Sequence, residues 1–217
     1  MSDTGAPRGA GADDGNLERE RVMDAAEELF LCHGFSGVSM DMVASRLGMS
    51  KKTLYQHFRS KDSLERATVD RFFSRAQQEM RTVLAGAQTI RERLAGFLSV
   101  LASHLSRVNL PAIEHLEFRN PALWKHVNGG REHLIRTQVG TMIEEAQASG
   151  ELRRDLSAEF MVGVFVTLVL TMATPSRLLH YSGGQAGFAA DLLSLLLDGM
   201  TGPASVDHTE EDYHHER

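Results

Sequence analysis

Along most of this chain apolar residues recur at intervals of three and four positions, the spacing that puts them on one face of an α-helix. The first such segment covers residues 17–32, where Val22, Ala26, Leu29 and Phe30 share a face. Gly34 then stands where a helix is expected to end. The pattern predicts an all-α fold that starts with an amphipathic scaffold helix.

The next stretch predicts a shorter helix and a sharp stop. Ser39 is placed to accept a hydrogen bond from the backbone at the start of that helix. Its inward residues are expected to be Met42, Val43 and Leu47. Gly48 tolerates the positive φ that commonly ends a helix. The stretch therefore predicts a helix followed by a tight glycine turn.

A third helix is predicted after that turn, with Ser50 as its cap. Leu54 and Phe58 stand four residues apart and are expected to face inward. At about 100° per residue, the opposite side carries hydrogen-bond donors, with Thr53 and Tyr55 flanking it. The outward residues are Lys52, Gln56 and Arg59. Two capped helices around a glycine turn have the spacing of a helix-turn-helix.

The charge on this segment is one-sided, although the whole chain is acidic. The chain carries 23 Lys and Arg against 29 Asp and Glu, a formal net charge of -6. From residue 46 to residue 61, however, the charged residues are Arg46, Lys51, Lys52, Arg59 and Lys61. A local basic face attracts a polyanion, while the remaining surface discourages indiscriminate coating of nucleic acid. The plainer alternative is a solvated helix surface without a partner.

Longer amphipathic segments follow. The predicted helices cover residues 60–84, 89–107, 122–149, 160–172 and 188–200. The helix from residue 60 is expected to begin in the N-terminal unit and to end in the next one, which makes it a mechanical link between them. Gly129 and Gly130 are expected to kink the third of these helices, and Gly150 to end it.

The last two of these helices are unusually apolar. The segment FMVGVFVTLVLTM is shorter than the about 20 residues that a membrane span needs, so we expect a helix buried on nearly all sides. The next helix adds Leu192, Leu193, Leu195, Leu196 and Leu197. Such a pair predicts that a second copy contributes the same helices to a four-helix dimer core. Burial against the preceding helices of the same chain is the alternative.

Composition adds limits on size and compartment. At 217 residues and 42% hydrophobic content, the chain can bury a sizeable core. The single cysteine, Cys32, rules out a disulfide within the chain and suits a reducing compartment. Residues 1–16 contain no apolar signal segment, so no signal or transit peptide is expected, and we expect a cytoplasmic protein. This arm and the acidic tail at 203–217 are expected to be disordered.

An ordered set of residues over Leu17 to Leu64 closely resembles the TetR family of bacterial transcriptional regulators. The set is Ala25-Ala26-x-x-Leu29-Phe30-x-x-x-Gly34-Phe35, Ser39-Met40, Val43-Ala44 and Gly48-Met49-Ser50-Lys51-x-Thr53-Leu54-Tyr55-x-His57-Phe58-x-Ser60-Lys61-x-x-Leu64. The resemblance implies an all-helical homodimer whose N-terminal domains lie in successive major grooves. It also implies repression until a small molecule binds the C-terminal domain. The C-terminal part more weakly resembles AcrR-like and AefR-like regulators.

The resemblance also implies which residues touch double-stranded operator DNA. On the recognition helix these are Lys52, Thr53, Tyr55, Gln56 and His57, and the phosphate contacts are Ser39, Ser50, Lys51 and Lys61. By chemistry, Gln56 suits an adenine edge and Lys52 a guanine edge. Tyr55 and His57 suit contacts to the DNA backbone. The alternatives are a half-buried packing role for Tyr55 and a cover over the glycine turn for His57.

Large soft residues on the later helices are candidates for a ligand pocket. They are Phe97, Leu101, Trp124, Met142, Phe165 and Met172. Such residues line sites for apolar or aromatic molecules, but they equally form ordinary helical cores. The histidines lack the spacing of a metal site, so no metal and no cofactor are expected. The chain lacks a phosphate loop, a nucleophile elbow and a paired-carboxylate constellation, so no catalytic residue and no enzyme activity are expected.

The sequence therefore predicts a disordered arm at 1–16, a helix-turn-helix DNA-binding domain at 17–63, a regulatory and dimerisation domain at 64–202, and a disordered tail at 203–217. The predicted function is a homodimeric repressor that a small apolar or aromatic effector releases from a palindromic operator. No membrane association is expected. The alternatives are a ligand-binding or antirepressor-type helical module that acts through protein contacts, and a transcriptional activator.

Overall fold

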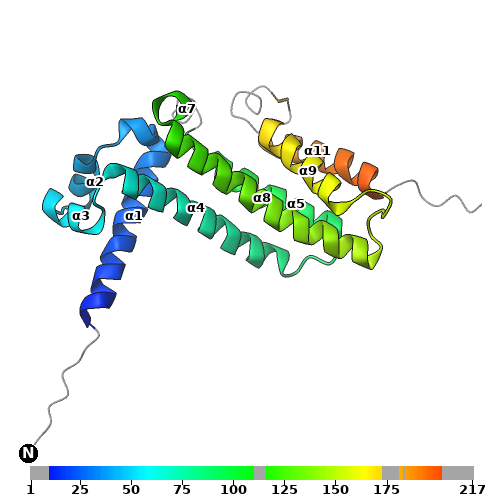
Figure 1. Ribbon diagram of the computed structural model, residues 1–217, viewed down its shortest axis with the longest axis horizontal. Helices are drawn as coiled ribbons and strands as arrows, with labels where there is room; N and C mark the ends of the chain where they lie inside the picture. Colours follow the sequence, from blue (N-terminus) through cyan, green and yellow to red (C-terminus); the bar gives the residue numbers. More distant parts are fainter. Residues whose placement is uncertain (1–9, 110–115, 173–180, 183, 202–217) are drawn as a thin grey trace, which may run out of the picture.

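The computed structural model describes residues 10–109, 116–172, 181–182 and 184–201, and the regular structure within these ranges is helical (Figure 1). The helices are α1 Ala10–Gly37, α2 Met40–Leu47, α3 Lys51–His57, α4 Lys61–Leu84, α5 Ile90–Ser106, α7 Leu116–Arg119, α8 Pro121–Ser149, α9 Ala158–Met172 and α11 Gly184–Thr201. The predicted all-α class is confirmed, with a helix-turn-helix unit followed by a larger helical unit. The expected tail at 203–217 lies outside the described residues.

Helix α1 begins earlier than the apolar pattern predicts. Residues 10–16, expected to belong to a disordered arm, are helical and belong to α1, and the first buried side chain among those described in this helix is Val22. The prediction was wrong here because it tracked the buried face, whereas backbone hydrogen bonding extends a helix beyond the residues that pack. The predicted stop at Gly34 is confirmed, since this residue has φ 72° and ψ 162° and breaks the helix.

The two short helices form with the predicted caps. Ser39 accepts a hydrogen bond from the backbone N–H of Met42 at 3.2 Å. Gly48 has a φ of 65° and ends α2. The inward face differs from the prediction, because Met40, Val43 and Ala44 are buried while Met42 is 38% exposed. Residues spaced three and four apart from Met40 share its face, and a residue two positions on lies on the other side.

The buried side chains form two clusters, and α4 contributes to both. The smaller cluster includes Val22, Phe30, Val43, Leu54 and Phe58, together with Leu64 and Val69 from the first part of α4 and Leu116 and Leu123 from α7 and α8. The larger cluster takes Ala76 and Met80 from the second part of α4. Phe73 lies between these segments and packs against both clusters. The predicted bounds of this linking helix are confirmed.

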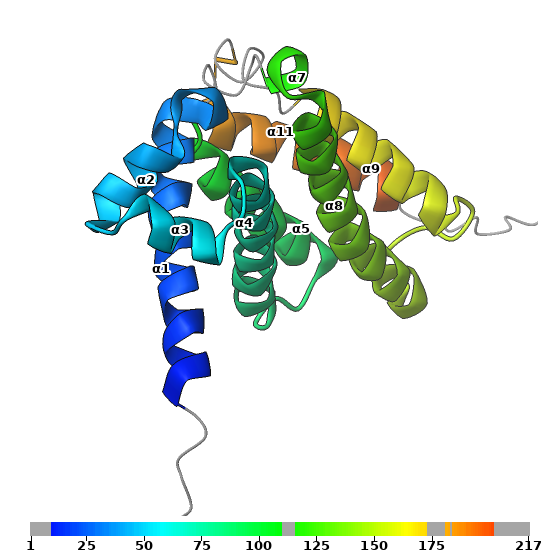
Figure 2. The ribbon, with the colours of Figure 1, turned by 60° about the vertical axis from the view of Figure 1, so that its left-hand side comes forward.

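The larger cluster lies among the remaining long helices. α4 packs against α5 and α8, α8 packs against α9, and α11 packs against α5 (Figures 1 and 2). Helices α1, α2 and α3 gather at one end of this bundle, and α9 and α11 lie on its far side (Figure 1). None of the helices in the described part of the chain is both long and apolar enough to span a membrane.

Polar contacts attach α1 to the bundle. Arg75 of α4 binds the buried carboxylate of Glu27 at 3.1 Å, and Arg107 at the end of α5 approaches the same carboxylate at 3.4 Å. Asn109 donates its backbone N–H to the Leu31 carbonyl at 3.0 Å and its side-chain amide to the Cys32 carbonyl at 2.8 Å. The last turn of α1 before its break is therefore held by residues about 80 positions later.

The glycine pair in α8 does not bend the helix, and one of the two glycines allows close contact with α4. The helix continues through Gly129 and Gly130 without interruption, so the predicted kink was wrong. A Cβ atom on Gly130 would stand 2.6 Å from Cε2 of Phe73, whereas a Cβ atom on Gly129 would meet nothing within 4 Å. Gly130 thus lets α8 lie directly on the aromatic ring that α4 places between the clusters.

Helix α9 is not buried on nearly all sides within one chain, which corrects that prediction. Met161, Phe165 and Val169 face the larger cluster. Phe160, by contrast, is 57% exposed. On α11, Leu195 is 71% exposed. A single chain covers one side of these helices and leaves apolar side chains of both in contact with water.

We expect G130A to destabilise the fold and G129A to stabilise it. The first adds a methyl group into the Phe73 ring, which costs roughly 1–3 kcal/mol when neighbours must shift. The second gains up to about 1 kcal/mol of helix propensity in open space. Urea unfolding of the two variants checks the difference, and equal midpoints would contradict a close contact at Gly130.

Candidate nucleic-acid interface

Helix α3 is short and lightly anchored. It has 7 residues, and Leu54 is the residue within it that is buried. Ser50 caps it by accepting the backbone N–H of Thr53 at 3.1 Å, and the two hydroxyl groups are 2.8 Å apart. Phe58, the next residue after the helix, is also buried, so both predicted inward residues are confirmed.

The outward side of α3 presents donors without a carboxylate. Lys52, Tyr55 and Gln56 are exposed, and Thr53 is half-buried beside them. Among the described residues, the side chains of Lys52 and Gln56 have no hydrogen-bond or ion-pair partner. Arg59 is exposed just after the helix. These side chains are accessible to a ligand approaching from the solvent side.

Two of the cations beside this face already have acidic partners. Lys51 pairs with Asp41 of α2 at 2.6 Å, and this hydrogen bond raises the pKa of Lys51. Arg46 pairs with Glu28 of α1 at 3.0 Å. Both pairs are exposed, so each is weak and screened by salt. A phosphate group can compete for these cations at modest cost.

Lys61 is directed into the protein and not toward the outward face of α3. Its Nζ donates to the Phe35 carbonyl at 2.7 Å and lies 3.4 Å from Oε1 of the buried Glu65. Burial raises the pKa of Glu65, and the charge of Lys61 partly opposes that shift. Asn120, which caps α8, donates to the other carboxylate oxygen at 3.4 Å. The structure therefore separates Lys61 from the other predicted phosphate contacts.

His57 also lies away from the outward face. Its side chain is mostly buried, and Nε2 lies 3.6 Å from a carboxylate oxygen of Glu18 on α1. Sequence reasoning missed the acidic partners Asp41, Glu65 and Glu18. The pairing of Glu65 with Lys61 could have been predicted from the sequence, because the two residues stand four apart on one helix. Asp41 and Glu18 become neighbours of their partners only through the tertiary fold.

The predicted pocket residues do not come together. Phe97, Met142 and Phe165 are buried in the larger cluster, where the rings of Phe97 and Phe165 meet edge to face at 6.0 Å. Leu101 packs on the same cluster, but Trp124 packs on the smaller one. Met172 is exposed at the end of α9. Most of the set therefore forms ordinary core, because helical periodicity reports burial and not the presence of a cavity.

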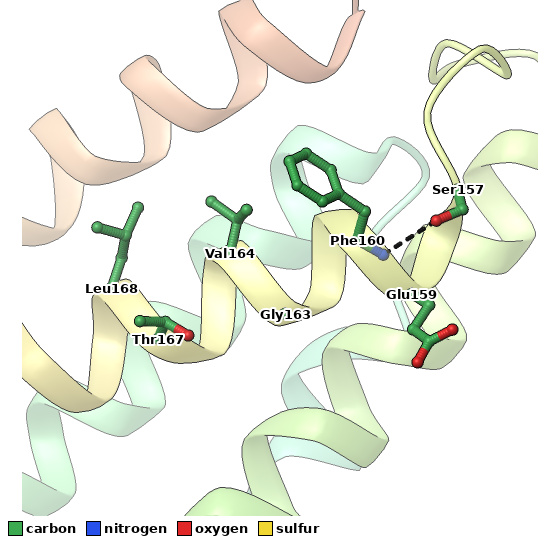
Figure 3. Close-up of a pocket in the computed structure, with 7 residues that line it drawn as sticks. All are labelled: Ser157, Glu159, Phe160, Gly163, Val164, Thr167 and Leu168. Carbon is green, nitrogen blue, oxygen red and sulfur yellow. Dashed lines mark hydrogen bonds between the residues drawn. The ribbon is translucent and has the colours of Figure 1, made fainter.

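An open groove of about 610 Å³ runs along the outer side of α9 (Figure 3). Its lining residues are Ser157, Glu159, Phe160, Gly163, Val164, Thr167 and Leu168. Figure 3 shows Phe160, Val164 and Leu168 along one side of the helix. Within the described ranges, no group of three His, Cys, Asp or Glu side chains is placed to hold a metal ion.

Comparison with known proteins identifies the N-terminal unit. Residues 22–68 match the sequence model of the family described as "Bacterial regulatory proteins, tetR family". The chain is 36% identical to the HTH-type transcriptional activator FasR of Mycolicibacterium smegmatis over 38% of its length and 40% of that protein. It is 27% identical to the HTH-type transcriptional regulator UidR of Escherichia coli over 64% of its length and 71% of that protein.

A solved structure extends the likeness to the whole fold. A TetR transcriptional regulator from Chloroflexus aurantiacus superposes with a TM-score of 0.66 at 24% sequence identity, covering 85% of this chain and 94% of that one. The helix-turn-helix geometry and these matches together define a DNA-binding transcription regulator. The N-terminal unit of the chain, residues 22–68, belongs to the TetR family, as its sequence predicts, and the rest of the chain shares the fold of a TetR regulator.

We expect the buried carboxyl of Glu65 to make stability depend on pH. Because its pKa in the folded state lies above the usual 4.5, the folded state binds the proton more tightly, and stability falls as pH rises from 4.5 through the raised value. The free energy of unfolding of the wild type, minus that of E65Q, should therefore decrease over this window. Urea titrations at several pH values measure it, and a difference that grows with pH contradicts the assignment.

Proposed function

We propose that this chain acts as a homodimeric repressor that binds a palindromic operator and leaves it when a small apolar or aromatic effector binds. The DNA-binding domain is assigned to residues 17–63 and the regulatory and dimerisation domain to residues 64–202. The observation that carries the proposal is the exposed side of α3, where Lys52 and Gln56 have no partner among the described residues and no carboxylate intervenes.

The proposed contacts divide by chemistry. Lys52 and Gln56 reach base edges in the major groove, where Lys pairs with guanine and Gln with adenine. The remaining contacts position the protein on phosphates, and they come from Ser39, Ser50, Lys51, Thr53 and Tyr55. His57 and Lys61 are left out of this set, because their polar atoms face other residues of the protein.

We expect K52A and Q56A each to weaken specific binding by about 1–3 kcal/mol while folding is unchanged, because each removes a base contact. The probe is the duplex that the wild-type protein selects from a randomised pool, and fluorescence anisotropy measures its affinity. R81A is the matched control, since Arg81 is an exposed cation near the end of α4 remote from α3 (Figure 1).

The same titration tests the binding class. Affinity for DNA should fall steeply between about 50 mM and 200 mM salt, because phosphate contacts release counterions. Affinity unchanged in both α3 variants, or insensitive to salt, would favour a module that acts through protein contacts.

The dimer part of the proposal rests on α9 and α11. Phe160 and Leu195 are largely exposed, and the groove beside Phe160 is lined by Val164 and Leu168. A second copy that contributes the same two helices would remove these side chains from water in a symmetric four-helix arrangement. Such symmetry would also present two α3 helices to the two halves of a palindrome.

We expect F160E to weaken the dimer by about 2 kcal/mol or more, because it places a charge in the proposed apolar contact. The matched control is V83E, since Val83 is 45% exposed on α4, away from this face. Sedimentation at micromolar concentration measures the oligomeric state. A wild-type protein that sediments as a monomer contradicts the dimer.

The effector and the sign of regulation need a functional assay. A small apolar or aromatic molecule is proposed because the TetR-type match implies a C-terminal domain that responds to a ligand, and the buried cluster of that domain is apolar. The relative FasR is named an activator, so repression is tested directly. A reporter carrying the selected duplex within its promoter should be silenced by the wild type and released by K52A.

A further inference from the structure

The carboxyl-terminal end of α3 is held by a side chain from α1. Arg19 donates from Nη1 to the carbonyl of His57, the last residue of α3, at 2.8 Å. Its guanidinium carbon also lies 4.1 Å from the centroid of the Phe58 ring. Arg19 thus meets the end of the recognition helix and the aromatic ring that anchors it at the same time.

Both contacts suit a planar cation. The last carbonyls of a helix lack partners within the helix and carry partial negative charge, so a positive donor stabilises them. A guanidinium group can stack on a ring and donate in its own plane, whereas a lysine ammonium cannot do both in the same way. Glu18, the preceding residue, faces the His57 imidazole and adds a second contact from α1.

The helix α3 has few anchoring contacts, so the contact at its carboxyl-terminal end contributes to its orientation. Ser50 holds the first turn, Leu54 the middle, and Phe58 the residue beyond the helix. A helix of 7 residues spans about 10 Å and has little stability of its own. A small change of angle at its end displaces Gln56, which is one residue before His57.

We propose that Arg19 is a positioning residue for sequence recognition: it sets the angle of α3 so that Lys52 and Gln56 meet base edges in register. This inference rests on the proposed DNA-binding function. Arg19 acts through the helix. Its loss would move Lys52 and Gln56 away from the base edges, while the basic side chains of α3 remain available to phosphate groups. Specific binding therefore suffers, and charge-driven binding to any duplex does not.

The test compares two duplexes, the one selected by the wild-type protein and a scrambled duplex of the same composition. The variants are R19A, R19K and R21A. Arg21 is the matched control, because it is an exposed arginine on the same helix with no hydrogen-bond or ion-pair partner among the described residues. Thermal unfolding and sedimentation establish that each variant keeps its fold and oligomeric state, and R19K retains the charge if R19A does not fold.

We expect R19A to lower the ratio of selected to scrambled affinity by about tenfold, the scale of one lost hydrogen bond to a helix end. R19K should fail to restore the full ratio, and R21A should leave the ratio unchanged because it removes only a charge. In the Q56A and K52A double variant, the further change R19A should have little effect on the ratio, since the contacts that it orients are gone.

Three outcomes overturn the inference. One is an unchanged ratio in R19A, which includes an equal loss of affinity for both duplexes. Another is the same fall of the ratio in R21A as in R19A. The third is an undiminished effect of R19A in the variant that lacks Lys52 and Gln56. Failure of the proposed function looks different, because the wild type itself would then select no duplex, and the inference would fall with it.

Discussion

The contact between Phe73 and Gly130 decides how the two buried clusters of this protein meet. The ring touches both clusters, and the absence of a side chain on Gly130 lets α8 lie against it. Close-packed contacts of this kind leave little room for independent movement. A tilt of α8 would therefore move α4 as well, and only three residues separate the end of α3 from the start of α4.

Around α3, basic side chains lie beside acidic ones. Lys51, Arg46 and Lys61 each have a carboxylate within reach, so the basic stretch of the sequence is less positive in three dimensions than it reads. Lys52 and Gln56 remain free of such partners among the described residues. In the proposed complex, recognition of base edges would rest on Lys52 and Gln56, and contacts to phosphates would have to displace the protein's own carboxylates.

What the sequence could predict was local. Caps at Ser39 and Ser50, the positive φ of Gly48 and the bounds of α4 all follow from neighbours within a few residues. Some of the differences came from contacts with residues far away in the sequence. The pair Gly129 and Gly130 was interpreted as a kink because the Phe73 ring, which explains Gly130, stands 57 positions earlier. The resemblance assigned Lys61 to phosphate, and the Phe35 carbonyl that Lys61 binds in the structure is 26 positions away.

The candidate pocket shows the same limit. Phe97, Phe165 and Trp124 were grouped by size and softness, which describe a core as well as a ligand site. The structure places the first two in one cluster and packs Trp124 on the other. Helical periodicity predicts that a residue is buried. It does not predict which residues pack against it, because that depends on the angles between helices far apart in the sequence.

Helix α1 contacts residues much later in the chain, and these contacts show how far residues 17–63 depend on the rest of the protein. The smaller cluster, against which α1 packs, includes Leu64, Val69, Leu116 and Leu123. Asn109 donates hydrogen bonds to the carbonyls of Leu31 and Cys32. A fragment that ends at residue 63 would lack these four apolar side chains and both hydrogen-bond donors of Asn109. Residues 17–63 therefore depend on the later helices for part of their buried core and for two of their hydrogen bonds.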